Sequence, residues 1–177
     1  KSAASSHKPP VPESCQRGVK LSVTFLPLST TGEIGDACYL LEVDGTTLIL
    51  DAGVHPRKKG VESLPSFQLA ADRDPDAILI SHCHLDHLGA LPVALSHFPH
   101  ARVLMSRASS ILAPVMLHHT ARVMERQQVE DTAGPPLYTH EDVDAISYVF
   151  QGMDATLLAC QKAQALNEAE GQSALAA

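Results

Sequence analysis

Apolar and polar residues alternate regularly between Val19 and Phe25. Apolar side chains at every second position are typical of a strand that buries one face. Two further apolar runs, CYLLEV and TTLILD, flank the dipeptide Asp44-Gly45, which favours a tight hairpin turn. The pattern predicts a half-buried strand followed by a β-hairpin.

Strands and helices alternate in the middle of the chain. The compact run DAILIS is typical of a strand buried on both faces, and ARVLMS is a further strand candidate. Helices are predicted at 61–71 (interrupted by Pro65) and from about Leu88, with Pro92 in the opening turn. A long helix that Ser106 or the residues just after it could cap is predicted to extend to about Arg126 or Gln128. This order predicts an α/β fold, a mixed sheet with flanking helices on one face.

Two more helices are predicted toward the end of the chain. The first covers 140–150, with Thr139 and Asp142 as a capping box, and the second is Ala- and Gln-rich and covers 154–170. The Ser-, Lys- and Pro-rich residues 1–18 have little to bury and are expected to be a disordered arm. A length of 177 residues favours one domain, which we place at 19–150.

Charge and cysteine content narrow the classes of function. The formal net charge of −7 argues against a protein that binds nucleic acid through a broad basic surface. The four cysteines form no CxxC zinc pattern, and the first residues contain no apolar signal segment. No apolar run is long enough to span a membrane. We therefore expect reduced thiols in a cytoplasmic protein with no membrane partner.

The strongest chemical signal is ISHCHLDHLGALP, which directly follows an apolar strand candidate. His82 and His84 are two residues apart, so both can reach one ion, whereas Asp86 and His87 can reach a second ion. Imidazole and carboxylate groups are suitable zinc ligands. A single histidine in a turn is usually structural, but four such groups in six positions favour a metal site.

Three segments resemble a known family. GEIGDACYLLEVDG, LDAGVHP and SHCHLDHLGALP are similar to motifs of the metallo-β-lactamase superfamily, and specifically of its β-CASP branch of RNA-processing nucleases. The resemblance covers about residues 20–150. It implies a partial metallo-β-lactamase fold of the αββα type and a complete enzyme that hydrolyses phosphodiester bonds in RNA.

The resemblance also assigns roles to residues. His82 and His84 would bind a first Zn²⁺, and Asp86 and His87 a second. Asp86 would also hold the nucleophilic water, and Asp51 would orient the ligand loop, so Asp86 and Asp51 are the expected catalytic residues. Such orientation works by fixing the tautomer and position of a ligand imidazole.

The complete metal site of the family needs further ligands, and this sequence has no residues that match them. A later GH-motif histidine, a bridging aspartate, a last histidine and a cap domain are all required, yet no histidine follows His140. The chain is therefore predicted to hold the N-terminal half of the domain, with residues 151–177 as a helical or disordered tail unlike the family. A missing C-terminal half or a homo-oligomer would have to complete the site.

Other candidate residues carry weaker signals. His55 lies in a loop expected to rim the site, and Arg57, Lys58 and Lys59 could contact phosphates, although most charge runs are simply solvated. Glu33 is expected near the site without a defined role, and Cys83 is interpreted as a packing residue. The remaining histidines are weak ligand candidates on or beside helices: His97, His100, His118, His119 and His140.

Three functional hypotheses remain open from the sequence. The first is a zinc-dependent RNA endo- or exonuclease whose complete form is active while this chain is weakly active or inactive. The second is a hydrolase of small esters, thioesters or lactams on the same fold, which the GALP and LDAGVHP segments disfavour. The third is a catalytically silent, truncated domain, which the missing ligands favour for this chain alone.

Overall fold

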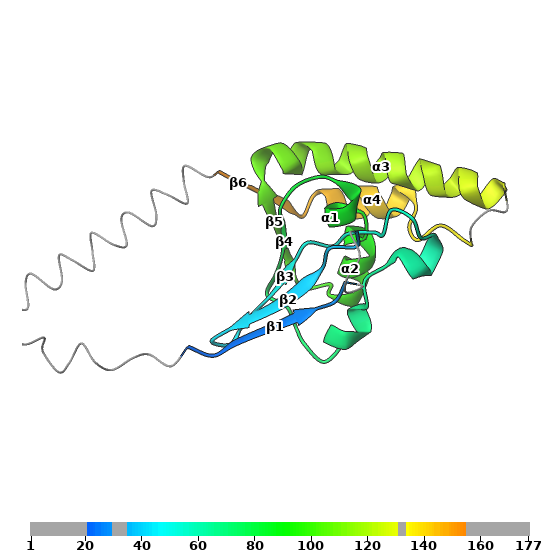
Figure 1. Cartoon of the computed structure of the whole chain (residues 1–177). Helices are drawn as coiled ribbons and strands as arrows, with labels where there is room; N and C mark the ends of the chain where they lie inside the picture. Colours follow the sequence, from blue (N-terminus) through cyan, green and yellow to red (C-terminus); the bar gives the residue numbers. More distant parts are fainter. Residues whose placement is uncertain (1–20, 30–34, 131–133, 155–177) are drawn as a thin grey trace, which may run out of the picture.

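The structure is a computed structural model that describes residues 21–29, 35–130 and 134–154. Its strands form one mixed sheet in the order β1-β2-β3-β4-β5-β6 (Figure 1). The first three strands are antiparallel, and those from β3 onward run parallel. The bounds are β1 Val23–Pro27, β2 Tyr39–Val43, β3 Thr46–Leu50, β4 Ala77–Ile80, β5 Arg102–Ser106 and β6 Phe150–Met153. The predicted α/β class with a mixed sheet is confirmed.

The helices follow the predicted order with one clear difference. The α-helices are α1 Leu85–Leu88, α2 Leu91–His97, α3 Arg107–Val129 and α4 His140–Ser147. The expected helix at 61–71 is instead two short 3-10 helices, η2 Gly60–Ser63 and η3 Phe67–Ala70. Pro65 lies between them, where the missing N–H and the fixed φ of proline break a continuous helix.

Local signals placed several element ends correctly. Asp44 and Gly45 both have positive φ in the β2–β3 turn, as a tight hairpin requires. The Ser106 side chain accepts a hydrogen bond from the Ser109 N–H and caps α3. Thr139 and Asp142 form the reciprocal capping box of α4.

The hydrophobic core lies on one face of the sheet. Leu40, Ile49, Ile78 and Val103 are paired across β2 to β5 and are fully buried. Leu88, Leu91, Leu117 and Val143 cover them from α1, α2, α3 and α4, which gather on one side of the sheet (Figure 1). Burial of these aliphatic side chains is the main stabilising contribution, because the core contains few aromatic rings.

No helix of the described residues covers the opposite, apolar face of the sheet at β1, which corrects the expected burial of this strand. Val23 and Phe25 are each 56% exposed, so the alternation that predicted a buried face marks an open one. Phe25 pairs with Leu41 and stacks on Tyr39, with ring centroids 5.4 Å apart. The described helices pack only on the other face, so no layer buries these side chains.

The sheet extends slightly beyond the expected domain boundary. The helix expected to reach Phe150 ends at Ser147, and Phe150–Met153 forms β6 beside β5. The arm at 1–18, Glu33 and all of the helix expected at 154–170 except its first residue, Asp154, lie outside the described residues. Among the helices that the structure describes, none is both long enough and apolar enough to cross a membrane.

Candidate metal centre

Asp51 and Ser81 follow the neighbouring parallel strands β3 and β4, so both lie at the same edge of the sheet. The Ser81 N–H donates to Asp51 Oδ1 at 2.7 Å, and the Ser81 hydroxyl donates to Asp51 Oδ2 at 2.8 Å. Asp51 adopts a φ of 60°, a left-handed conformation that aspartate tolerates better than most residues. The carboxylate is thereby fixed at the start of the histidine motif.

This pair also sets the tautomers of two histidines. The Nδ1 atom of His87 lies 2.8 Å from Asp51 Oδ2, which can only accept, so Nδ1 carries the proton. Ser81 uses its one hydroxyl proton on Asp51, so its oxygen accepts from His82 Nδ1 at 3.0 Å. In their neutral forms, both rings therefore have an Nε2 lone pair available for a metal ion.

The motif residues converge in a small volume. The His82 ring centroid lies 4.5 Å from that of His84 and 4.2 Å from that of His87. Asp86 Oδ2 lies 3.7 Å from His87 Nε2. His84 caps α1, and its carbonyl accepts from the N–H groups of His87 and Leu88. The turn into α1 therefore brings all four predicted ligands to one edge of the sheet.

Gly53 has a structural role that the sequence reading missed. The segment at 52–54 forms backbone hydrogen bonds with the carbonyls of His87 and Leu85, and Gly53 bonds with Ala37. A Cβ atom at Gly53 would overlap the carbonyl oxygen of Asp86. The DAG element therefore holds the ligand helix by direct backbone contact, which only glycine permits.

The donor set for a metal ion is incomplete. In the described part of the chain, no three His, Cys, Asp or Glu residues form a group that could hold an ion by themselves. The oriented Nε2 atoms of His82 and His87 do suit zinc, whose sites use imidazole and carboxylate ligands. The residues present therefore fit part of a zinc site.

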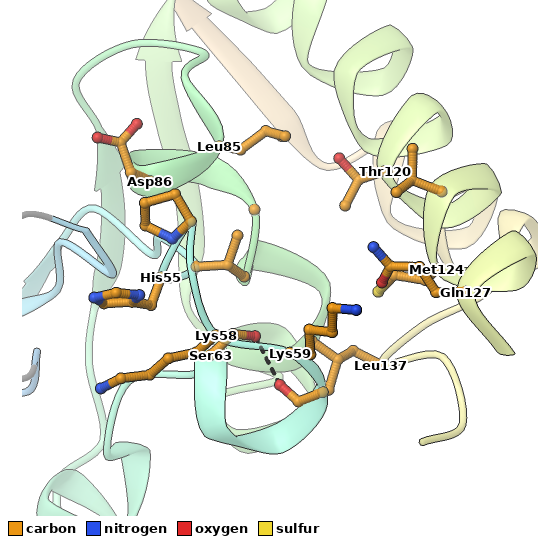
Figure 2. A pocket seen from close by; sticks show the side chains of 15 residues that line it. His55, Lys58, Lys59, Ser63, Leu85, Asp86, Thr120, Met124, Gln127 and Leu137 are labelled. Atoms are coloured by element: carbon orange, nitrogen blue, oxygen red, sulfur yellow. Dashed lines mark hydrogen bonds between the residues drawn. The ribbon is translucent and has the colours of Figure 1, made fainter. Parts of the chain in front are cut away.

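Of the three predicted substrate-contact residues, two line a groove beside the predicted metal centre and one lies outside it. His55 is 3% exposed, and its Nδ1 accepts from the Arg57 N–H at 3.2 Å, so its ring supports the loop. His55 and Lys58 line a groove that reaches Asp86, whereas Arg57 is exposed outside it (Figure 2). Lys59 also lines this groove.

Two of the remaining histidines form a separate cluster. His118 of α3 and His140 of α4 approach with their Nδ1 atoms 2.7 Å apart. His118 Nε2 lies 3.2 Å from Asp144, and His140 Nε2 lies 3.8 Å from Glu125. The cluster links the two helices to each other.

The cysteines near the site are packed. The Cys83 thiol donates to the Ser109 carbonyl of α3 at 3.4 Å, and the side chain packs against the core. This position agrees with its interpretation as a packing residue. Cys38 is fully buried. Burial raises the pKa of the Cys38 thiol well above its ordinary value, and the Asp51 and Asp36 carboxylates raise it further. Cys38 therefore stays protonated behind the site.

Comparison with known proteins identifies the family. Residues 32–147 match the model of the metallo-beta-lactamase superfamily. The chain is 35% identical over 122 residues to endoribonuclease ysh1 of Aspergillus fumigatus, covering 68% of this chain and 14% of that protein. It is 32% identical over 123 residues to endoribonuclease YSH1 of Saccharomyces cerevisiae, covering 67% and 16%.

A solved structure of AidC, a dizinc quorum-quenching lactonase, is 20% identical with a TM-score of 0.40, covering 66% of this chain and 42% of that one. The chain spans about a seventh of the length of the endoribonucleases it matches. The match to the superfamily model and the similarity to these endoribonucleases together show that the chain belongs to the metallo-β-lactamase superfamily, in its β-CASP branch.

Proposed function

We propose that this chain is the N-terminal part of a zinc-dependent nuclease that hydrolyses phosphodiester bonds in RNA. The observation that carries the proposal is the network of Asp51 and Ser81 with His82 and His87, which orients two imidazoles toward one volume. The similarity to endoribonucleases supports RNA as the substrate. We also propose a cytoplasmic location.

The residues have distinct proposed roles. His82 and His84 would bind one zinc ion, and Asp86 and His87 a second, with Asp86 also positioning the attacking water. Bound zinc lowers the pKa of a coordinated water and stabilises charge on phosphoryl oxygens. Asp51 and Ser81 would act through the rings they orient, since each accepts from an Nδ1–H and leaves the Nε2 of that ring available to an ion.

The 177-residue chain by itself is proposed to bind zinc weakly and to cleave RNA little. Each ion would have two credible protein ligands, and no group of three is present in the described residues. An ion with too few ligands is mobile, and a displacement of about 1 Å can lower a rate roughly 10²-fold. A C-terminal half or a second protomer would supply the missing ligands.

The test combines zinc calorimetry with cleavage of a labelled single-stranded RNA. It compares the wild-type chain, His84→Ala, and His100→Ala as a matched control, because His100 is exposed away from the motif. We expect weak zinc binding that His84→Ala reduces and His100→Ala does not, and a longer chain that supplies the missing ligands should cleave RNA in a His84-dependent way. Zinc binding that is insensitive to His84 would overturn the proposed site.

A further inference from the structure

We propose that the groove between the loop at 54–63 and helix α3 holds the nucleotide adjacent to the scissile phosphate of a single-stranded RNA. This inference rests on the proposed function and names the binding surface that the substrate would use next to the metal centre. Figure 2 shows the groove, with the loop on one side and α3 on the other.

The two walls come from distant parts of the sequence. Thr120, Val123, Met124 and Gln127 line the groove, and their spacing puts them on one face of α3. Val54, Lys58 and Lys59 line it from the loop, and Leu85 of α1 and Gly89 directly after that helix also line it. The cavity measures about 430 Å³, within the range of about 300–1,000 Å³ for small-ligand sites. That size suits a nucleotide of a single strand.

The chemistry of the walls matches a nucleotide. Val54, Leu85 and Met124 offer apolar surfaces on which the face of a base can pack. Beside Met124 on the α3 wall, Gln127 offers an amide and Thr120 a hydroxyl, which donates to the Met116 carbonyl and can therefore accept from the polar edge of a base. Single-strand binding surfaces usually combine a basic groove with side chains on which bases pack, most often aromatic ones, and aliphatic side chains would take that place here.

The charges in the groove favour an anionic ligand. Lys58 and Lys59 are the only lysine or arginine side chains among the described residues that line it, and Asp86 is the only carboxylate. In Figure 2, Lys59 extends across the groove toward α3, whereas the Lys58 ammonium and the Asp86 carboxylate point away from α3. This local positive charge contrasts with the formal net charge of −7. A backbone phosphate complements it.

The position of Asp86 connects the groove to the chemistry. Asp86 lies at one end of the groove and also within 3.7 Å of His87 Nε2 in the predicted metal centre. A strand whose scissile phosphate lies at the metal centre would therefore place its next nucleotide between Lys59 and α3.

The inference can be tested by RNA binding to the full chain without zinc. The probe is a short fluorescein-labelled single-stranded RNA, and its anisotropy is measured in a chelator-containing buffer at several salt concentrations. The variants are Lys59→Glu and Met124→Ser. Their controls on α3 are Arg122→Glu and Val129→Ser, which are exposed outside the groove.

We expect Lys59→Glu to weaken binding about fivefold or more and to lower the slope of log affinity against log salt by about one. Arg122→Glu should change affinity less than twofold, and Met124→Ser should weaken binding more than Val129→Ser. The same RNA annealed to its complement should bind more weakly than the single strand. If Met124→Ser unfolds, Lys59→Glu still tests the inference, because Lys59 is exposed and its replacement should not affect folding.

Equal effects of Lys59→Glu and Arg122→Glu, no binding by the wild-type chain, or preferred binding of duplex RNA would each overturn the inference. A groove that binds a peptide instead would leave RNA affinity unchanged in Lys59→Glu. RNA binding is measured without zinc, so its result does not depend on the metal site that the cleavage test of the proposed function examines. His84-dependent cleavage with unaltered RNA binding by Lys59→Glu would reject the groove alone.

Discussion

Asp51 and Ser81 end adjacent parallel strands and are joined by two hydrogen bonds of 2.7 and 2.8 Å, one from the backbone N–H of Ser81 and one from its hydroxyl. The pair contains no predicted metal ligand, yet it fixes the orientation of His82 and His87. This relationship leads to the first two predictions.

Asp51→Asn should weaken zinc binding about 10–100-fold, the usual effect of removing a group that orients a metal ligand. Asparagine tolerates the left-handed backbone at this position, so the fold should persist. Zinc competition assays and circular dichroism would measure the two effects. Asp74→Asn, at an exposed position, is the control, and equal zinc affinities in the two variants would contradict the orienting role.

Ser81→Ala should remove the hydrogen bond that keeps His82 in its Nδ1–H tautomer. The wild-type ring carries its proton on Nδ1 because the Ser81 oxygen accepts from it. Without this acceptor, nitrogen-15 NMR should show a population of the Nε2–H tautomer for His82, while His87 remains protonated on Nδ1 through Asp51. Ser66→Ala should leave both spectra unchanged. An unchanged His82 spectrum in Ser81→Ala would rule out the assigned network.

Gly53→Ala should destabilise the fold by about 1–3 kcal/mol or more, because an added methyl group overlaps the Asp86 carbonyl and forces the backbone to move. Gly134→Ala is the matched control, since a Cβ there has no neighbour within 4 Å and the φ of Gly134 is not positive. Urea unfolding of both variants measures the difference. Equal urea midpoints for the two variants would mean that α1 accommodates the added methyl group without loss of stability.

Phe25→Thr should reduce binding of a hydrophobic dye and self-association of the isolated chain. The Phe25 side chain is 56% exposed on the open sheet face, so its replacement removes apolar surface that water contacts. In contrast, Phe67→Thr should cost about 3–5 kcal/mol, because Phe67 is fully buried. Dye fluorescence, size-exclusion chromatography and urea unfolding would separate the two effects. Unaltered dye binding in Phe25→Thr would show that this face is covered.

Stability should fall as the pH rises above about 8.5, the ordinary pKa of a cysteine thiol. Burial, followed by Asp51 and Asp36, raises the pKa of Cys38 in the folded state. The unfolded chain therefore loses this proton first, and the free energy of unfolding decreases by up to about 1.4 kcal/mol per pH unit. Below that pH both states are protonated, and this loss is absent.

Urea unfolding between pH 7 and 9.5 would measure this slope, and Cys38→Ala should flatten it. Burial also raises the pKa of Tyr138, but the ordinary pKa of tyrosine is near 10, so most of its effect falls above this window. A slope that Cys38→Ala leaves unchanged would assign the alkaline loss to other groups.

Local sequence determined the elements and the chemistry of this protein. Asp44-Gly45 specified the hairpin, Ser106 and Thr139 the helix starts, and the apolar run at 77–80 the strand before the histidines. Each signal acts through neighbours in the chain, so a single sequence can reveal it. The clustering of His82, His84, Asp86 and His87 is likewise encoded by their spacing.

Tertiary structure decided what depends on contacts between distant segments. Val23 and Phe25 alternate as a buried strand would, but the helices cover the other face of the sheet. The contacts of Ser81 with Asp51 and of Gly53 with Asp86 join residues far apart along the chain, and the groove is lined by two distant segments, the loop at 54–63 and α3. Periodicity reports which side chains are apolar, whereas only the packing of layers and the pairing of parallel strand ends determine what each side chain contacts.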